Sequence, residues 1–294
     1  MALRADIDTL KVLAAQPLIQ NCRSLTVDLH QVEFKVFSQF GDDGIIQYLI
    51  HRLEHLPDTF VEFGVENYRE SNTRFLLLNN NWRGLVLDGD QDSINYIQHD
   101  EISWRHTLTA RRAFITRDNI NDLLHEAGFT GEIGLLSIDI DGNDYWVWEK
   151  IAIVDPVIVI MEYNSVFGPH LAVTIPYEPQ FVRYQAHYSG LFWGASLQAL
   201  KLLADQKGYS LIGCNSAGTN TYFVRNDKVA DLPVLSVQEA FVDARFRDSR
   251  DEKGKFTYLT GAQRFFAIAG LEVYDLRQNK IVPLNSLRAK PNPP

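Results

Sequence analysis

The sequence is poor in cysteine, in basic residues and in long apolar runs, and each shortage excludes a class of protein. Its two cysteines, Cys22 and Cys214, lie far apart and give no disulfide framework. Lys and Arg number 28 against 37 Asp and Glu, and the formal net charge of −9 argues against a nucleic-acid partner. No run approaches the roughly 18 apolar residues that a membrane span needs. We therefore expect a soluble, cytoplasmic protein.

The hydrophobic content of 46% over 294 residues is enough for the core of one large α/β domain with a modest appendage. Apolar residues spaced by three and four, Leu3, Ile7, Leu10 and Leu13, predict a helical lead-in. The expected organisation is a lead-in over 1–37, a core over 38–230 with an insertion at 165–193, and an extension over 231–294 that ends in a disordered Pro-rich tail.

The stretch 59–73 indicates how the core is built. The apolar run that contains Glu62 stops at Gly64, and a helix with Phe75 and Leu76 follows. A strand that ends at a glycine and continues into a helix is typical of the first βα unit of a doubly wound sheet. Further strands are predicted at 84–88, near 106–110, at 133–138 and at 157–161. Hairpins are predicted from 209–213 with 220–225, and from 271–276 with 280–283.

Acidic and amide side chains follow the predicted strands where those strands end. They are Glu62, Asp88 or Asp90, Asp139, Glu162 and Asn164, with Asp141 close behind. Parallel topology brings these ends into one crevice, and clustered carboxylates repel one another unless a cation sits among them. The pattern predicts either a metal ion or a cationic ligand. The alternative is that each acid only caps the helix after it.

The turn after Gly64 is not a full glycine-rich fingerprint, because Glu66, Tyr68 and Glu70 occupy its positions. A pyrophosphate would be repelled there, which disfavours NAD and FAD. Gly64 still allows the backbone to approach a ligand closely. A ligand with a ribose and no phosphate fits better, and a carboxylate after the second strand suits ribose hydroxyls. Asp88 is the preferred candidate.

Asp139, Glu162 and Asn164 together offer hard oxygen ligands of the kind that Mg²⁺ prefers. Such an ion could hold a diol and lower the pKa of its hydroxyl. His170, in the insertion, is the candidate general base, because a neutral imidazole accepts a proton near neutral pH. A lone loop histidine is also common as a plain surface residue. The aromatic residues of the insertion could face a sugar ring, a second subunit of a homo-oligomer, or the core.

The motifs at these positions resemble those of class I S-adenosylmethionine-dependent methyltransferases, and among them the FkbM-like and macrocin O-methyltransferase-like groups. The segment 38–43 (SQFGDD) is similar to the short motif before the core of FkbM-like proteins, and 61–65 (VEFGV) to motif I. The segment 87–90 (LDGD) lies where the ribose-binding acid belongs, and 137–145 (SIDIDGNDY) resembles the Asp motif after the fourth strand. The resemblance covers roughly residues 38–225.

This resemblance implies an α/β, Rossmann-like fold: a mostly parallel seven-stranded sheet with an antiparallel final hairpin strand and helices on both faces. It implies methyl transfer from S-adenosylmethionine to the hydroxyl of a sugar or glycoside, for example in polysaccharide biosynthesis, with Glu62 near the methionine amino group. The implied cofactor residues are Gln39, Glu62, Gly64, Asn72, Asp88 and Asp139; the implied catalytic residues are Asp139 and His170. Two alternatives stay open: another nucleotide-sugar enzyme such as a dehydrogenase, and a non-catalytic methyltransferase-like scaffold.

Overall fold

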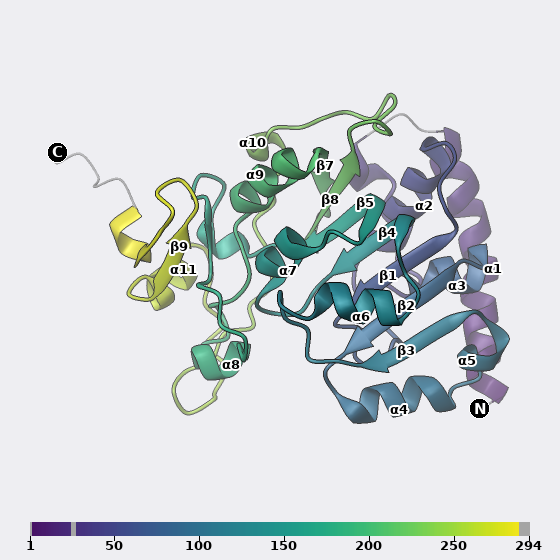
Figure 1. Ribbon diagram of the computed structural model, residues 1–294, viewed down its shortest axis with the longest axis horizontal. Coiled ribbons are helices and arrows are strands. Elements are labelled where there is room, and N and C mark those ends of the chain that lie inside the picture. The colour runs from purple at the N-terminus through teal and green to yellow at the C-terminus, as the bar shows by residue number, and fades with distance from the viewer. Residues whose placement is uncertain (1, 25–27, 288–294) are drawn as a thin grey trace.

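A seven-stranded sheet forms the centre of the computed structural model, which describes residues 2–24 and 28–287 (Figure 1). The strand order is β3-β2-β1-β4-β5-β8-β7. Its strands are β1 (Thr59–Phe63), β2 (Arg83–Asp88), β3 (Leu108–Arg112), β4 (Gly131–Ile138), β5 (Val154–Glu162), β7 (Tyr209–Cys214) and β8 (Asn220–Arg225). The predicted strand near 106–110 therefore lies two residues further along the chain, as β3.

The five strands β1 to β5 are parallel, and β8 runs antiparallel to both of its neighbours, β5 and β7. Strand β1 is central, with Glu62 opposite Val86 of β2 and Ser137 of β4. Both faces of the sheet are covered, which is why its central strands are nearly continuous apolar runs. This is the Rossmann-like, class I methyltransferase fold that the sequence predicts.

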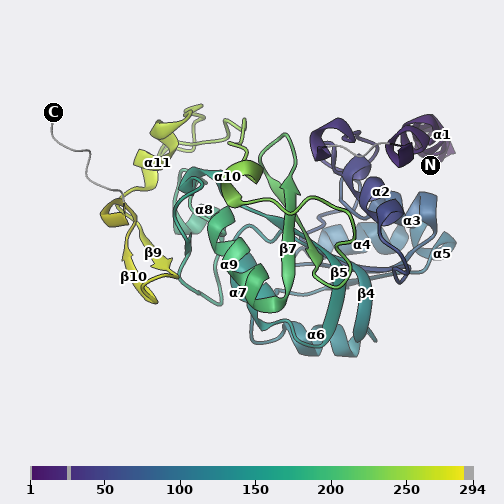
Figure 2. The same ribbon diagram turned by 90° about the horizontal axis from the view of Figure 1, so that it is seen from above.

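Helices form a layer on each face of the sheet (Figures 1 and 2). One layer contains α2 (Asp42–Arg52), α3 (Arg74–Asn80), α4 (Gln91–His99) and α5 (Ile102–Arg105); the other contains α6 (Ile120–Glu126), α7 (Asp144–Lys150), α9 (Leu197–Lys207) and α10 (Val237–Ala240). A hydrophobic core lies between the sheet and each helix layer, and successive residues of β1 point to opposite faces of the sheet. Phe60 therefore belongs to the core under the first layer, and Val61 to the core under the second.

The insertion and the C-terminal extension fold together beside the main sheet. Strand β6 (Val173–Thr174) of the insertion pairs with β9 (Glu272–Asp275), which pairs with β10 (Lys280–Pro283). The hairpin of β9 and β10 is as predicted, and β6 is a strand that the sequence did not indicate. With α11 (Ala262–Ile268) these strands enclose a separate small core that includes Ile175, Phe192, Ile268 and Val273. The insertion also carries the one-turn helix α8 (Arg183–Ala186).

The lead-in contains one long helix, α1 (Ala2–Ser24), and a short 3-10 turn at Leu29–Gln31. Its buried residues, Ala15, Ile19 and Cys22, face the body of the protein. Ile7, Leu10 and Leu13, which carry the predicted spacing, are instead exposed. No helix of the described residues is both long and apolar enough to cross a membrane. The tail at 291–294 lies outside the described residues.

Candidate functional site

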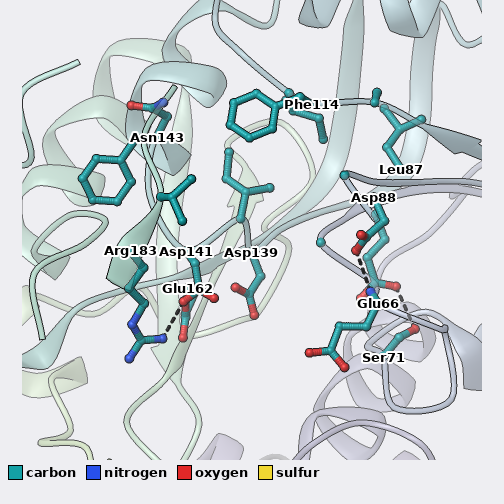
Figure 3. Close-up of a pocket in the computed structure, with 18 of the residues that line it drawn as sticks. Glu66, Ser71, Leu87, Asp88, Phe114, Asp139, Asp141, Asn143, Glu162 and Arg183 are labelled. Carbon is teal, nitrogen blue, oxygen red and sulfur yellow. Dashed lines mark hydrogen bonds and ion pairs between the residues drawn. The ribbon is translucent and has the colours of Figure 1, made fainter. Parts of the chain in front are cut away.

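A cavity of about 520 Å³ lies beyond the carboxyl ends of β1, β2, β4 and β5, where a doubly wound sheet binds its ligands. All six predicted cofactor residues line it: Gln39, Glu62, Gly64, Asn72, Asp88 and Asp139. Figure 3 shows two groups of side chains facing each other across this space, with Asp88, Glu66 and Ser71 on one side and Asp141, Glu162 and Arg183 on the other. Asp139 lies between them.

Glu62 anchors the loop that follows β1. Its buried carboxylate accepts hydrogen bonds from Ser71 Oγ at 3.0 Å and from Asn72 N at 2.8 Å. Thr73 donates to the same carboxylate through N at 3.0 Å and Oγ1 at 2.5 Å. Burial raises the pKa of Glu62, and these donors act in the opposite direction. Three of the four bonds reach Oε2, so Oε1 is the oxygen with acceptor capacity left for a ligand.

Position 64 requires a glycine because of its backbone conformation and its close packing. Its φ is +72°, and a Cβ there would lie 1.6 Å from the carbonyl oxygen of Asp139. The end of β1 and the loop after β4 therefore touch at a point where only a glycine fits. This contact brings Asp139 up to the turn that carries Glu66.

Asp88 joins the turns after β1 and β2. Its carboxylate accepts hydrogen bonds from Glu66 N at 2.7 Å and from Asp90 N at 2.8 Å. Asp90 does not line the cavity and instead caps α4 by accepting from Ser93 N at 2.9 Å. Asp88 is thus the acid whose carboxylate faces the cavity, with lone pairs remaining for further donors.

The segment that carries Gln39 is held by two buried acids. Asp43 Oδ2 accepts from the backbone N–H groups of Val36, Phe37 and Ser38, at 2.7–2.8 Å. Asp42 Oδ1 accepts from the amides of Asn215 and Asn220, at 3.0 and 2.9 Å. Asn220 starts β8, pairs in register with Glu162 and lines the cavity. The 38–43 motif therefore fixes Gln39 and the antiparallel hairpin strand against each other.

Asp139, Asp141 and Glu162 form a compact acidic group in which one oxygen of each lies within 4.8 Å of the others. Burial raises the pKa of Asp139 to about 8, helped by the charges of Asp141 and Asp144. Burial together with Asp139 and Asp141 raises the pKa of Glu162 well above its usual range. Glu162 Oε2 is buried without a hydrogen-bond partner. Asp139 and Glu162 therefore hold a proton between them near neutral pH.

Among the described residues that line the cavity, Arg183 is the only Lys or Arg, against seven Asp and Glu. Its Nη1 lies 2.6 Å from Asp141 Oδ1, and its Nε donates to the carbonyl of Gly190 at 2.7 Å. The guanidinium also lies over the ring of Trp193, 4.9 Å from the centroid. Arg183 neutralises only Asp141, and Lys35 pairs with Glu70 at 2.9 Å; the remaining lining carboxyl groups outnumber these pairs, so the cavity as a whole is acidic.

Two predicted site residues lie outside this lining. The Asn164 amide donates to the carbonyls of Leu191 and Trp193, both at 3.0 Å, and its oxygen accepts from Val166 N at 3.1 Å. This buried side chain fixes the start of the insertion, and Asp141 takes its place in the acidic group. His170 is exposed and is not among the lining residues.

Sequence reasoning missed Arg183, Asn220 and the aromatic lining residues Phe114 and Phe181, whereas Tyr184 is one of the insertion aromatics considered for a sugar ring, a second subunit or the core. Phe114 and Phe181 come from loops, and no local pattern sets them apart from other loop aromatics. Asn220 could have been found, because an antiparallel β8 next to β5 places its first residue beside Glu162.

Comparisons with known proteins find similar solved structures but no match by sequence. No protein-family model matches the sequence, and no curated protein matches it either. Similar solved structures include an O-methyltransferase from Bacillus cereus in complex with SAH, at 12% identity and a TM-score of 0.39, covering 73% of this chain and 90% of that one. An S-adenosylmethionine-dependent methyltransferase from Clostridium acetobutylicum shows 12% identity and a TM-score of 0.39, covering 72% and 96%. The N-terminal domain of EvdMO1, in the presence of SAH and D-fucose, shows 10% identity and a TM-score of 0.39, covering 71% and 94%. Because these TM-scores fall below 0.5, we assign no activity from them.

Proposed function

We propose that this protein is an S-adenosylmethionine-dependent O-methyltransferase that acts on a hydroxyl of a sugar or glycoside. The supporting observation is the charge of the cavity: seven carboxylic side chains of the described residues line it, and the basic residue beside them is already paired with Asp141. Such a site favours a ligand that is cationic and carries no phosphate. When bound, S-adenosylmethionine supplies a methyl group on a positively charged sulfur, with an amino group and a ribose.

We assign different parts of the cofactor to different residues along the cavity. Asp88, whose oxygens accept only two backbone N–H groups, would accept from ribose hydroxyls, and Glu62 Oε1 would receive the methionine ammonium. Phe114 and Ile115, which follow β3, offer apolar surface for the adenine. Gln39 and Asn72 add amide groups to the same lining. This assignment rests on lining position and free hydrogen-bonding capacity.

For the chemistry, we assign the proton of the acceptor hydroxyl to Asp139 and Glu162. Bound S-adenosylmethionine would supply the methyl group: the acceptor oxygen would form a bond to the methyl carbon, and the electron pair of the carbon–sulfur bond would stay on sulfur. The hydroxyl proton passes to the ionised member of the Asp139–Glu162 pair, whose raised pKa suits a base near neutral pH. Phe181 and Tyr184 line the same end and can pack against a sugar ring.

The acidic group also fits a divalent cation. Asp139, Asp141 and Glu162 provide oxygen ligands within 4.8 Å of one another, and the unpartnered Glu162 Oε2 is one of the oxygens available to it. We propose these three residues as the Mg²⁺ ligands, with Asp141 in place of Asn164; Mg²⁺ would then replace the proton that Asp139 and Glu162 share, so these two residues act as the base only in the metal-free protein. A bound ion would help to ionise the acceptor hydroxyl.

Calorimetry tests the proposal and its two alternatives together. S-adenosylmethionine and its product S-adenosylhomocysteine are each titrated into the protein, with and without Mg²⁺, and NAD is titrated in parallel. We expect binding of both sulfur nucleotides and none of NAD. Asp88→Ala should weaken their binding more than tenfold, because two ribose hydroxyls lose their acceptor, whereas Asp122→Ala, on α6, serves as the control. Binding of NAD alone would indicate a dehydrogenase, and no binding of any nucleotide would indicate a scaffold.

A further inference from the structure

Helix α1 leaves one apolar face uncovered. Its buried residues Ala15, Ile19 and Cys22 pack toward the body, while Ile7, Leu10, Leu13 and Leu18 are 45–64% exposed. Figures 1 and 2 both place α1 at the outer edge of the molecule, with its neighbours on one side only. Four exposed aliphatic side chains in 12 residues are more than the scattered surface leucines of ordinary proteins.

These exposed residues follow the spacing of a coiled-coil seam. With Ile7 at position a of a heptad, Leu10 falls at d and Ala14 at the next a; the following d position is Pro17, so the apolar seam runs only from Ile7 to Ala14. The flanking e and g positions hold the other exposed aliphatic residues, Leu13 at g and Leu18 at e. The residues that face the body fall on the opposite side, at b and f.

We propose that α1 pairs in parallel and in register with α1 of a second copy of this chain. Charge complementarity supports this occupant. In a parallel pair, each g residue meets the partner's e residue five positions further along. Asp6 at g then faces the partner's Lys11 at e, twice by symmetry, and Leu13 faces the partner's Leu18. Asp6 and Lys11 are both exposed, and Lys11 Nζ also lies 5.1 Å from the centroid of the Phe37 ring, a contact that it would exchange for the partner's Asp6.

The alternative orientation lacks this complementarity. In an antiparallel pair, g residues meet g residues and e residues meet e residues, so Asp6 and Lys11 find no opposite charge. Ile at a with Leu at d is also the combination that favours two parallel strands. Leu13 also borders a hollow of about 710 Å³ between α1, α3, α4 and α5.

The first test measures mass in solution by sedimentation equilibrium. The wild-type chain should be a dimer, and Leu10→Glu, which places a carboxylate in the seam, should weaken the dimer at least tenfold. The matched control is Ile281→Glu, because Ile281 is an aliphatic residue 51% exposed on β10, far from α1. It should remain a dimer. A monomeric wild type, or dissociation by both variants alike, would overturn the proposal.

The second test fixes the orientation. Asp6→Lys and Lys11→Asp should each weaken the dimer, by roughly fivefold to tenfold, because both symmetric contacts become repulsive. The double variant D6K/K11D should restore it.

A cysteine substitution gives an independent test of the orientation. Ala14→Cys should form an intermolecular disulfide under a glutathione redox buffer, since equal a positions of two parallel helices face each other across the two-fold axis. A double swap that fails to restore the dimer, or an Ala14→Cys chain that stays unlinked, would overturn the parallel register. None of these measurements depends on methyl transfer, so the dimer and the proposed function fail separately.

Discussion

At the scale of single residues, burial decides what the acids of the cavity can do. Asp88 stays on the open side with its oxygens tied only to backbone N–H groups, whereas Asp139 and Glu162 are crowded together and hold a proton. Asp144 beside them is structural, because its oxygens accept from Ile140 N and Gly142 N and shape the loop that presents Asp139. Neighbouring carboxylates thus differ in role because their environments differ.

Asp139 and His170 can be separated by substitution. Asp139→Asn removes the proposed base with little change in shape, so we expect turnover to fall at least a hundredfold with the fold intact by circular dichroism. His170→Ala should leave turnover within twofold, because His170 is exposed and lies outside the cavity lining. Methyl transfer from labelled S-adenosylmethionine measures both. The opposite pattern would return the role of base to His170.

The raised pKa values also predict how stability depends on pH. A carboxyl whose pKa is raised in the folded state keeps its proton at a pH where the unfolded chain has lost it, so stability falls as pH rises. The pKa of Asp139 is raised from 3.8 to about 8, and those of Asp43 and Asp144 to about 6. We therefore expect the melting temperature of the ligand-free protein to fall between pH 5 and pH 8. In the Asp139→Asn variant, the melting temperature should fall less above pH 6 than in the wild type. An equal fall in both proteins would contradict the raised pKa of Asp139.

At the scale of elements, the site depends on how strand ends meet. The turn after β1, the loop after β4 and the start of β8 converge because β1 lies between β2 and β4, and β8 lies beside β5. Glu66 and Tyr68 adopt positive φ values of 47° and 59° in the turn after β1. Non-glycine residues rarely adopt this conformation, so the turn is held by its partners, among them Asp88 and Glu62.

Gly64→Ala tests this convergence. The new Cβ would collide with the Asp139 carbonyl at 1.6 Å, on a backbone with φ of +72°. We expect the free energy of unfolding to fall by about 3 kcal/mol or more. Gly128→Ala is the matched control, because Gly128 has φ of +76° but no heavy atom within 4 Å of the added Cβ. It should cost only about 1–2 kcal/mol. Urea unfolding measures both, and equal losses would mean that the contact with Asp139 is not tight.

At the scale of the whole molecule, the insertion and the C-terminal extension act as one unit. They share the sheet of β6, β9 and β10 and a core of their own, and α8 of the insertion carries Arg183 to the cavity. The main sheet therefore supplies the proposed cofactor residues, while this unit supplies one wall of the proposed acceptor end.

Ile268→Ala should separate the two ends of the cavity. Ile268 is fully buried in the small core, so its truncation should cost about 2–5 kcal/mol of stability. We expect the KM for the acceptor to rise severalfold while the affinity for S-adenosylhomocysteine stays within twofold. Phe266→Ala on the same helix is the control, since Phe266 is 63% exposed. A large loss of nucleotide affinity in Ile268→Ala would show that the two ends are not independent.

The sequence alone determined the parallel core, the antiparallel hairpin strand and most of the cavity floor. Strands β1, β2, β4 and β5 are buried on both faces and read as apolar runs, and an acid after such a run must lie at the carboxyl edge of the sheet. Glu62, Asp88, Asp139 and Glu162 could be placed together for this reason.

Only the tertiary structure decided which side chains complete the site and which face of helix α1 remains exposed to solvent. Asn164 turns toward Leu191 and Trp193 and Asp141 joins the acidic group because the insertion folds back over β5, which no local pattern records. Arg183 arrives from the same insertion. The apolar spacing of α1 predicted a helix but not its orientation, because a helix has more than one apolar face and packing against α2 and α3 selects the buried one. Local periodicity fixes an element, whereas contacts between residues far apart in the chain fix its surroundings.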